Sequence, residues 1–580
     1  MKLEQLRKRI AVSQRREPAD LIIRNGMIAD VFSLSWKKAD IVVADGIIVA
    51  IDESGTFKAL HEEEANGQYI VPGFIDGHIH IESSMVPPSE FSKVLLPRGV
   101  TAAITDPHEI ANVLGIKGIR FMIEDAEDAD MDIFVMLPSS VPSTIFEHAG
   151  SVLTAQDLKP LLSEPSVLGL AEVMDFPAVL SGDEYMLQKL AVTTEHGLPI
   201  DGHGAGLNSD QIRGYRAAGI QTDHECVTAE EALDRVAQGM YVMIREGSAA
   251  KNLKALLPAV TTANARRFLF CTDDKHLDEL LTEGGVDYAV KLAISEGMEP
   301  IQAIQLATLN AAECFGLKNR GALATGYKAD FFITPDLGNL NAVAVWKDGK
   351  KVAENHHMLN RAYENRKIDV AVLHTVHLPK LTAEDFLIRL DHPKAHVMKI
   401  IPDQIMTKKV VIEVPVTNSQ FQPCTEQDLL KLAVIERHHG LGHIGLGIVT
   451  GFGLKSGAVA TTIAHDSHNV IILGTNDEDM LLAVQALKDS SGGLVVVDQG
   501  KVLSCLPLPI AGLMTDQPAD VAVEKLHELH QSLKTICPEL NFHLFLTLSF
   551  LSLPVIPELK LTDIGLFDVT EFKHIPIEAE

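Results

Sequence analysis

The chain of 580 residues carries 78 acidic and 50 basic side chains, which give a formal net charge of −28 at pH 7. Such a chain repels polyanions and its sequence shows no basic stripe, so we expect no nucleic-acid partner. With 46% hydrophobic and 22% charged residues it has the composition of a soluble globular protein. At about 150 residues per domain, we expect three or four domains.

Cysteine usage and apolar runs both favour a cytoplasmic protein. The six cysteines include no CxxC pair, which excludes a disulfide framework and a thiolate zinc site. Residues Met1 to Arg16 are of mixed charge and lack the apolar core of a signal peptide. The apolar stretch Leu544–Leu553 has about half of the roughly 20 residues that a bilayer span needs. We therefore interpret it as a buried strand and expect no membrane contact.

Residues 19 to 70 have the pattern of short strands joined by tight turns. Asn25-Gly26 and Asp45-Gly46 stand between apolar runs, as in type I′ hairpins. The same texture returns at residues 321–353, where Asp348-Gly349 follows two apolar runs. Two β-rich segments on either side of a long insertion predict one small β-sandwich, formed by residues 1–70 and 321–370.

Between residues 71 and 320, apolar runs typical of buried parallel strands alternate with helical stretches. Each run ends at polar or charged residues, and these ends follow one another at intervals of 21 to 34 residues. Eight such units in about 250 residues match the size of a (β/α)8 barrel, whose strand ends converge on one mouth. The predicted fold class is therefore α/β, with a (β/α)8 TIM-like barrel inserted in the small β-sandwich.

Residues 371–580 are expected to form an additional C-terminal α/β domain, connected to the rest at about residues 355–382. The hydrophobic pattern predicts strands at Val410–Val416, Val470–Leu473 and Leu494–Val497, and helices at Asp428–His438 and Glu478–Leu487.

Four histidines and two carboxylates fall at the predicted strand ends of the barrel. His78 and His80 end the first strand, where alternate side chains point the same way and could share one cation. The remaining four end the fourth, fifth, sixth and eighth strands: Glu172, His203, His224 and Asp273. A polar barrel rim that only satisfies backbone groups is the alternative interpretation, but the shared position favours a metal centre.

These ligand positions resemble the amidohydrolase superfamily, whose members have His-x-His after strand 1, single histidines after strands 5 and 6, and an aspartate after strand 8. Many binuclear members carry a carboxylated lysine at strand 4, where this chain has Glu172. Further motifs are similar to those of bacterial adenine deaminases, and this resemblance extends from end to end: Asp106–Asn112, Arg245–Ala250, His465–Asn469 and Leu553–Glu558.

The resemblance implies hydrolytic deamination of adenine to hypoxanthine and ammonia by a metal-bridging hydroxide. Nitrogen and oxygen ligands suit Mn(II), Fe(II) or Zn(II). We expect two ions, and Mn(II) is the preferred candidate. One ion is assigned to His78, His80 and Asp273, and the other to His203 and His224, with Glu172 between them. Asp273 is expected to move the proton from water to the departing nitrogen, and Glu109 to protonate the ring nitrogen.

Several other residues have two interpretations each. Ser140 and Glu246 could contact the purine, although serines after strands more often bond backbone groups in turns. Arg245 and Glu246 could also simply pair with each other or with neighbours. Glu225 follows a ligand directly, so on a strand it would face away from the centre. The cluster His465-Asp466-Ser467-His468 could close the active site, bind a further metal or form a structural network.

One departure from the adenine deaminase pattern concerns the substrate. The family usually has Ala-Pro-Gly after the strand 5 histidine, whereas this chain reads His203-Gly204-Ala205-Gly206. Loss of the proline frees φ in that loop and could reshape the pocket wall. Alternatives are therefore another aminated heterocycle or a cyclic amide as substrate, or a non-catalytic purine-binding paralogue. The resemblance also implies a homo-oligomer, with a dimer expected.

Overall fold

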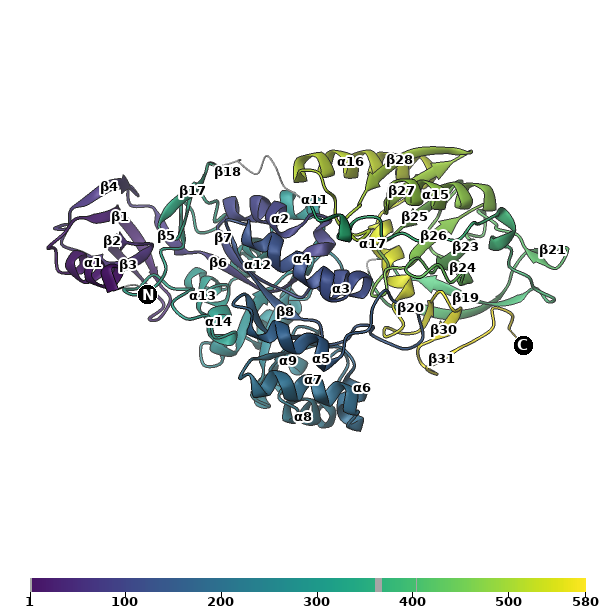
Figure 1. Cartoon of the computed structure of the whole chain (residues 1–580), viewed down its shortest axis with the longest axis horizontal. Coiled ribbons are helices and arrows are strands. Elements are labelled where there is room, and N and C mark those ends of the chain that lie inside the picture. Colours follow the sequence, from purple (N-terminus) through teal and green to yellow (C-terminus); the bar gives the residue numbers. More distant parts are fainter. Residues whose placement is uncertain (1–2, 360–367, 403, 580) are drawn as a thin grey trace.

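The computed structural model describes residues 3–359, 368–402 and 404–579. The chain forms an elongated molecule in three parts (Figure 1). An N-terminal sheet lies at one end, a layer of parallel strands and helices lies in the middle, and a C-terminal sheet with its helices lies at the other end. The predicted connection at 355–382 includes residues 360–367, which are outside the described residues.

The N-terminal sheet combines strands from both sides of the long insertion, as predicted. Its strand order is β18-β17-β16-β15-β5-β1-β2-β3, with β4 paired to β1. The two segments meet where β15 runs antiparallel to β5, with Phe331 opposite Pro72. Helix α1 (Leu3–Ser13) packs on β3. The strands are β1 Ala19–Asp30, β2 Ser35–Ala44, β3 Ile47–Asp52, β4 Ala59–Glu64, β5 Tyr69–Pro72, β15 Phe331–Thr334, β16 Ala344–Lys347, β17 Lys350–Glu354 and β18 His357–Met358.

Two of the three predicted hairpin turns are confirmed and the third is wrong. Asp45-Gly46 and Asp348-Gly349 have φ values of 50° and 72°, and 49° and 72°, the positive values that a type I′ turn requires. Asn25-Gly26 instead lies inside β1, at a bulge where β1 changes partner from β4 to β5. A Cβ at Gly26 would lie 2.2 Å from Cδ1 of Ile70, so glycine is needed there for the close approach of β5.

The middle of the molecule is a curled sheet of parallel strands whose end returns to its start. The strand order is β10-β9-β8-β7-β6-β14 in one ladder and β11-β12-β13 in the other. Strand β14 pairs with β6, and the Gln221 N–H donates to the Ile200 carbonyl at 3.1 Å, which joins β11 to β10. The strands are β6 Phe74–His80, β7 Val100–Thr105, β8 Asp132–Leu137, β9 Val167–Val173, β10 Ile200–Gly202, β11 Thr222–Asp223, β12 Tyr241–Arg245, β13 Phe268–Cys271 and β14 Asp273–Asp274.

Helices alternate with these strands, so all strands run the same way and their C-terminal ends share one edge. The alternation of buried apolar runs with helices was the predicted pattern of a (β/α)8 fold. The helices are α2 Pro88–Leu95, α3 His108–Leu114, α4 Ile116–Glu127, α5 Ala155–Leu158, α6 Phe176–Ser181, α7 Glu184–Glu195, α8 Ser209–Ala217, α9 Ala229–Ala237, α10 Leu253–Leu256, α11 Leu277–Thr282, α12 Val286–Ser295, α13 Pro300–Leu306 and α14 Leu309–Cys314.

The C-terminal region contains an eight-stranded sheet of order β20-β19-β24-β23-β26-β25-β27-β28 and a smaller sheet of β29, β30 and β31. Helices α15 and α16 pack on β27 and β28. The elements are β19 Lys394–Ile400, β20 Thr407–Glu413, β21 Val416–Thr417, β22 Gln420–Phe421, β23 Leu430–Ile435, β24 Ile444–Thr450, β25 Ala458–Thr461, β26 Val470–Gly474, α15 Asp477–Asp489, β27 Gly493–Asp498, β28 Lys501–Pro507, α16 Ala519–Ile536, α17 Leu544–Ser549, β29 Leu559–Leu561, β30 Leu566–Asp568 and β31 Lys573–His574.

Two element predictions in this region are wrong. The segment Asp428–His438 contains the central strand β23, paired on both sides with β24 and β26, so tertiary pairing overrides its helix-like pattern. The stretch Leu544–Leu553 is helix α17 followed by a 3₁₀ turn at Phe550–Ser552, with every residue buried. A short apolar run has no periodicity that separates a buried strand from a buried helix. Among the described residues, no helix combines the length and apolarity needed to cross a bilayer.

Contacts between the C-terminal region and the parallel strands fix the position of the C-terminal region. The Thr515 N–H donates to the Met85 carbonyl at 2.8 Å, and the Ala519 N–H donates to the Glu90 carboxylate at 3.1 Å. Helix α16 also contacts α2 and α11. These contacts place α17 and the following 3₁₀ turn beside the edge where the parallel strands end (Figure 1).

Candidate metal centre

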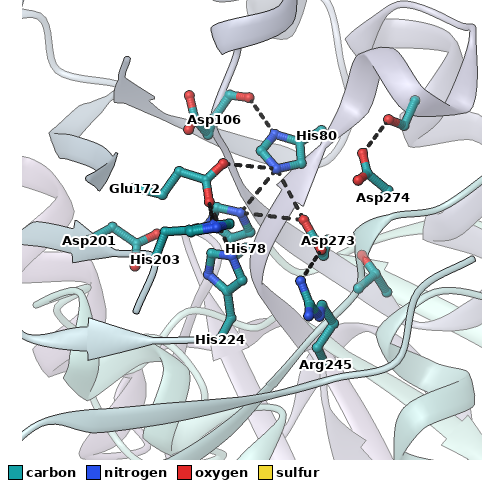
Figure 2. A network of polar contacts seen from close by, with 12 residues as sticks. His78, His80, Asp106, Glu172, Asp201, His203, His224, Arg245, Asp273 and Asp274 are labelled. Atoms are coloured by element: carbon teal, nitrogen blue, oxygen red, sulfur yellow. Dashed lines mark hydrogen bonds and ion pairs between the residues drawn. The ribbon is translucent and has the colours of Figure 1, made fainter. Parts of the chain in front are cut away.

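The structure brings all six predicted ligands together at the C-terminal ends of the parallel strands (Figure 2). On β6, His78 Nε2 and His80 Nε2 lie 3.2 Å apart. The Asp273 carboxylate, at the start of β14, is 3.1 Å from His80 Nε2 and 3.8 Å from His78 Nε2. We call His78, His80, Glu172, His203, His224 and Asp273 the candidate metal centre.

Glu172, at the end of β9, lies between two groups of histidines. Its Oε2 is 2.8 Å from His203 Nδ1 and 3.1 Å from His224 Nε2, while its Oε1 is 3.4 Å from His80 Nε2. Burial alone would raise the pKa of Glu172, but the neighbouring His203 and His224 hold it well below the usual range. The carboxylate is therefore ionised and faces both groups, as a bridging ligand must.

Hydrogen bonds on the far side of two rings turn their Nε2 atoms inward. His78 Nδ1 lies 2.9 Å from the Asp201 carboxylate, and His80 Nδ1 lies 3.0 Å from the Asp106 backbone carbonyl. Such partners fix the tautomer and orientation of histidines that bind metals. His224 Nδ1 is buried without a hydrogen-bond partner among the described residues. The donor set of nitrogen and oxygen atoms, with inward-facing lone pairs, fits divalent cations.

Arg245, at the end of β12, holds two carboxylates at the rim of the centre. Its guanidinium pairs with Asp273 at 2.8 Å and with both oxygens of Glu225. Burial opposes ionisation of Asp273, but the guanidinium and His80 hold its pKa well below the usual range. Asp273 also has φ of 58°, a left-handed conformation that is uncommon outside glycine and is found at functional sites.

The predicted orientation of Glu225 is wrong, and of the two predicted pairings of Arg245 the structure shows the one with neighbours and not the one with Glu246. Glu225 Oε1 lies 3.4 Å from His224 Nε2, beside the centre. Strand β11 ends at Asp223, so the alternation of faces does not extend to residues 224 and 225. Because Glu225 is therefore within reach of Arg245, the guanidinium pairs with it and with Asp273. Glu246 instead accepts a hydrogen bond from the Leu253 N–H at 3.2 Å.

A second polar group next to the centre includes residues that the sequence did not assign. His108 Nδ1 is 3.3 Å from Asp106 and 3.5 Å from Glu172, and its Nε2 is 3.6 Å from Asp466 of the C-terminal region. Burial lowers the pKa of His108, but Asp106 and Asp466 raise it well above the usual value. The motif Asp106–Asn112 is the sequence signal that could have identified Asp106 and His108. The contact between His108 and Asp466 could not be predicted from sequence spacing.

The C-terminal region completes the cavity at the centre. This small cavity, of about 50 Å³, is lined by every predicted ligand except His78 and by side chains of the C-terminal region: Ile405, His465, Asp466, Phe550, Leu553 and Ile556. An adjoining cavity of about 1430 Å³ shares His203, Glu225, Arg245 and Ile405 with it. The way to the centre therefore runs between the parallel strands and the C-terminal region.

Three predicted substrate or proton-transfer residues do not line either cavity. The Ser140 hydroxyl lies 2.9 Å from that of Ser139. Glu246 bonds the backbone, as described above. Glu109 accepts a hydrogen bond from Ser83 at 2.9 Å and lies behind His465, whose Nδ1 is 3.8 Å away. The roles predicted for Ser140, Glu246 and Glu109 remain predictions.

Two members of the cluster at residues 465–468, His465 and Asp466, line the small cavity. The His465 ring lines the small cavity and stacks on Phe550 with ring centroids 4.3 Å apart. His468 Nδ1 accepts a hydrogen bond from the Ala464 N–H at 3.2 Å, so the proton of the neutral ring is on Nε2, which faces Glu109 at 3.9 Å. A protonated Nε2 is not a metal ligand. This geometry favours a polar network over a further metal at His468.

The loop that departs from the adenine deaminase pattern packs tightly at its first glycine. A Cβ at Gly204 would lie 2.5 Å from Oδ2 of Asp223, and the Gly204 N–H donates to the same carboxylate at 3.0 Å. Ala205 and Gly206 line the larger cavity, so the departure does affect a cavity wall.

Comparisons with known proteins agree with this architecture. The model of the "Amidohydrolase family" matches residues 69–353, and that of the "Adenine deaminase C-terminal domain" matches residues 404–573. An adenine deaminase of Lysinibacillus sphaericus (strain C3-41) is 61% identical over 579 residues, 100% of both chains. The adenine deaminase of Bacillus subtilis (strain 168) is 50% identical over 581 residues, again 100% of both. The chain belongs to the adenine deaminase family of amidohydrolases.

The two family models together match both parts of the chain that form the cavity, the parallel strands and the C-terminal region. The amidohydrolase match contains the six residues of the candidate metal centre, and the C-terminal match contains the Phe550 and Leu553 wall. The amidohydrolase family implies a divalent metal, which the donor set described above fits. A solved structure of an adenine deaminase is 18% identical and covers 58% of this chain and 100% of its own, with a TM-score of 0.45.

Proposed function

We propose that this protein deaminates adenine by hydrolysis, giving hypoxanthine and ammonia. The observation that carries the proposal is identity of 48–61% to adenine deaminases over essentially the full length. The convergence of six ligands supports it, since a non-catalytic paralogue would be expected to lose some of them.

The centre would hold two divalent ions. His78, His80 and Asp273 would bind one ion, His203 and His224 the other, and Glu172 would lie between them. Mn(II) is the first candidate, and Fe(II) and Zn(II) accept the same nitrogen and oxygen donors. When bound, such ions supply Lewis acidity that lowers the pKa of water.

Asp273 would carry the proton that the reaction moves. In the overall reaction the oxygen of water bonds to C6 of adenine and the C6–N bond breaks to release ammonia. One proton of water leaves with that nitrogen, and the other replaces the proton that the ring nitrogen receives. Asp273 is ionised and faces the centre, so it can take a proton from water and deliver it to the departing nitrogen. Arg245 orients this carboxylate through the 2.8 Å contact.

Glu109 would supply the proton for the ring nitrogen by way of His465. Burial, together with the nearby Glu82 and Asp274 carboxylates, raises the pKa of Glu109 well above the usual value, so it carries a proton. His465 lies between Glu109 and the cavity, with its ring on the cavity wall. The apolar side chains of Ile405, Phe550 and Leu553 offer a wall for the faces of a planar base.

The test is purification with added Mn(II) under anaerobic conditions, followed by assays for ammonia release on a panel of purines, pterins and cyclic ureides. We expect adenine to be the best substrate by kcat/KM, and elemental analysis to find two ions per chain. Release of ammonia from another heterocycle in place of adenine would overturn the substrate assignment. No activity despite two bound ions would favour the purine-binding paralogue.

Cellular location and assembly complete the proposal. We place the protein in the cytoplasm, since all six cysteines, each within the described residues, are free thiols, as in reducing compartments. The homodimer is proposed from the family resemblance alone, and light scattering of the purified protein would test it.

A further inference from the structure

Two histidines and one aspartate from segments far apart in the sequence meet outside the candidate metal centre. His148 lies in the segment between β8 and α5, His443 directly precedes β24, and Asp563 lies in the turn between β29 and β30. We call these three residues the interface cluster, because they join the parallel-strand part of the molecule to the C-terminal region. Their ligand atoms all lie within 4.8 Å of one another.

Both histidines direct Nδ1 at the same carboxylate oxygen. Asp563 Oδ2 is 2.6 Å from His148 Nδ1 and 3.8 Å from His443 Nδ1, and the two ring centroids are 4.8 Å apart. The other oxygen, Oδ1, accepts the His148 N–H at 3.0 Å, which fixes the carboxylate plane. The converging atoms are thus two nitrogens and one oxygen, a donor set that suits Zn²⁺.

The charge of Asp563 calls for a cation. Its side chain is fully buried, and in the described ranges its only ion-pair partners within 4.0 Å are these two histidines, with no lysine or arginine among them. Burial of a carboxylate without a cation is costly, as it is for other unpaired charges. A divalent ion between the three donors would supply that cation.

The interface cluster is more open to solvent than the candidate metal centre. The side chains of His148 and His443 are 33% and 49% exposed, so an ion can enter from solvent and keep water ligands. The cluster therefore resembles a three-ligand site with an open position, held against a buried carboxylate.

We propose that the interface cluster is a Zn²⁺ site that fastens the segment after β8 to the C-terminal region. The same segment is bonded to the turn that bears His465: the His148 carbonyl accepts from Asn469 at 2.8 Å. Zn²⁺ bound here stabilises the folded protein, because the site does not exist in the unfolded chain. It is independent of the six ligands of the candidate metal centre.

The test uses full-length protein whose candidate metal centre has been loaded with Zn²⁺, so that metal exchange there cannot confuse the count. Free Zn²⁺ is raised stepwise, and bound Zn²⁺ is measured by equilibrium dialysis with elemental analysis for the wild type, His443→Ala and Asp563→Asn. The matched control is His439→Ala, whose Nε2 lies 3.1 Å from the Ala149 carbonyl at the same interface but outside the cluster.

We expect the wild type and His439→Ala to bind one more Zn²⁺ per chain than His443→Ala and Asp563→Asn, whose affinity for that ion falls at least about tenfold. Added Zn²⁺ should raise the thermal unfolding midpoint of the wild type and the control, but not that of His443→Ala. Deamination of adenine by His443→Ala should be unchanged. Equal Zn²⁺ counts in the wild type and His443→Ala, or loss of the extra ion in His439→Ala, would overturn the site.

Discussion

At the scale of single residues, the candidate metal centre depends on which ring nitrogen each histidine turns inward. The His78 and His80 rings are oriented by Asp201 and by the Asp106 carbonyl, which leave both Nε2 atoms at the centre. His203 differs, since its Nδ1 faces Glu172. Histidines that are oriented in this way need no rearrangement to bind a cation, which makes each of them sensitive to substitution.

We expect His203→Ala to bind fewer metal ions than the wild type and to lose roughly a thousandfold in kcat/KM, because several kcal/mol of transition-state stabilisation are lost. Elemental analysis and the ammonia assay measure the two effects. His196→Ala is the matched control, since its ring caps the end of α7 through the Val192 carbonyl at 2.7 Å, outside the centre. Wild-type turnover with a full metal complement in His203→Ala would contradict the assignment of two ions.

Arg245 offers a second test at this scale. Arg245→Met would leave the buried Glu225 and Asp273 carboxylates without their cation, and we expect kcat/KM to fall by about two orders of magnitude. Arg245→Lys keeps the charge but cannot pair with both carboxylates in the same geometry, so its kcat/KM should lie between those of the wild type and Arg245→Met. Arg213→Met, at a 60% exposed side chain on α8, should match the wild type. If Arg245→Met keeps wild-type kcat/KM, Arg245 does not orient Asp273 for the reaction.

At the scale of elements, β29 holds two segments of the cavity wall in place. Lys560 of β29 is fully buried, and its Nζ donates to the Ile405 carbonyl at 2.7 Å and to the Phe550 carbonyl at 2.9 Å. Both acceptors belong to residues that line the small cavity. Burial lowers the pKa of Lys560 from 10.5 to about 7.

This pKa predicts a stability that rises with pH. Between about pH 7 and 10.5 the unfolded chain binds a proton at Lys560 that the folded protein does not bind, so the free energy of unfolding increases with pH. The unfolding midpoint of the wild type, relative to Lys560→Met, should therefore rise from pH 7 to 9. Lys560→Arg stays charged and should show no such rise. Parallel midpoints of the wild type and Lys560→Met would refute a depressed pKa.

At the scale of the whole molecule, the cavity exists only because two parts of the chain meet. The parallel strands supply the ligands, and the C-terminal region supplies the apolar wall and the polar pair His465 and Asp466. Substrate binding should therefore be sensitive to residues of the C-terminal region that touch no ligand of the metal.

Phe550→Ala tests this arrangement, because it removes the ring that stacks on His465. We expect KM for adenine to rise about tenfold, equivalent to about 1.4 kcal/mol, with the metal content unchanged. Phe32→Ala, at a 51% exposed position in the turn between β1 and β2, serves as the control and should leave KM unaltered. An unchanged KM in Phe550→Ala would show that the C-terminal wall does not contact the substrate.

The sequence by itself determined what depends on spacing along one chain. Alternating strands and helices put the six ligands at the ends of the first, fourth, fifth, sixth and eighth predicted strands, and parallel strands bring such ends to one edge. The residue types likewise predicted the hairpin turn at Asp45-Gly46, because a type I′ turn requires positive φ at both central residues.

Tertiary structure alone decided contacts between segments that sequence spacing does not relate. Asn25-Gly26 became a bulge because β5 approaches β1 there. Leu544–Leu553 became helical although it is buried throughout, and its sequence has no periodicity that could have distinguished a helix from a strand. The approach of Asp466 to His108, and of His443 to Asp563, depends on how the C-terminal region packs on the parallel strands. Local periodicity carries no information about such packing, since the energy that decides it comes from surfaces hundreds of residues apart.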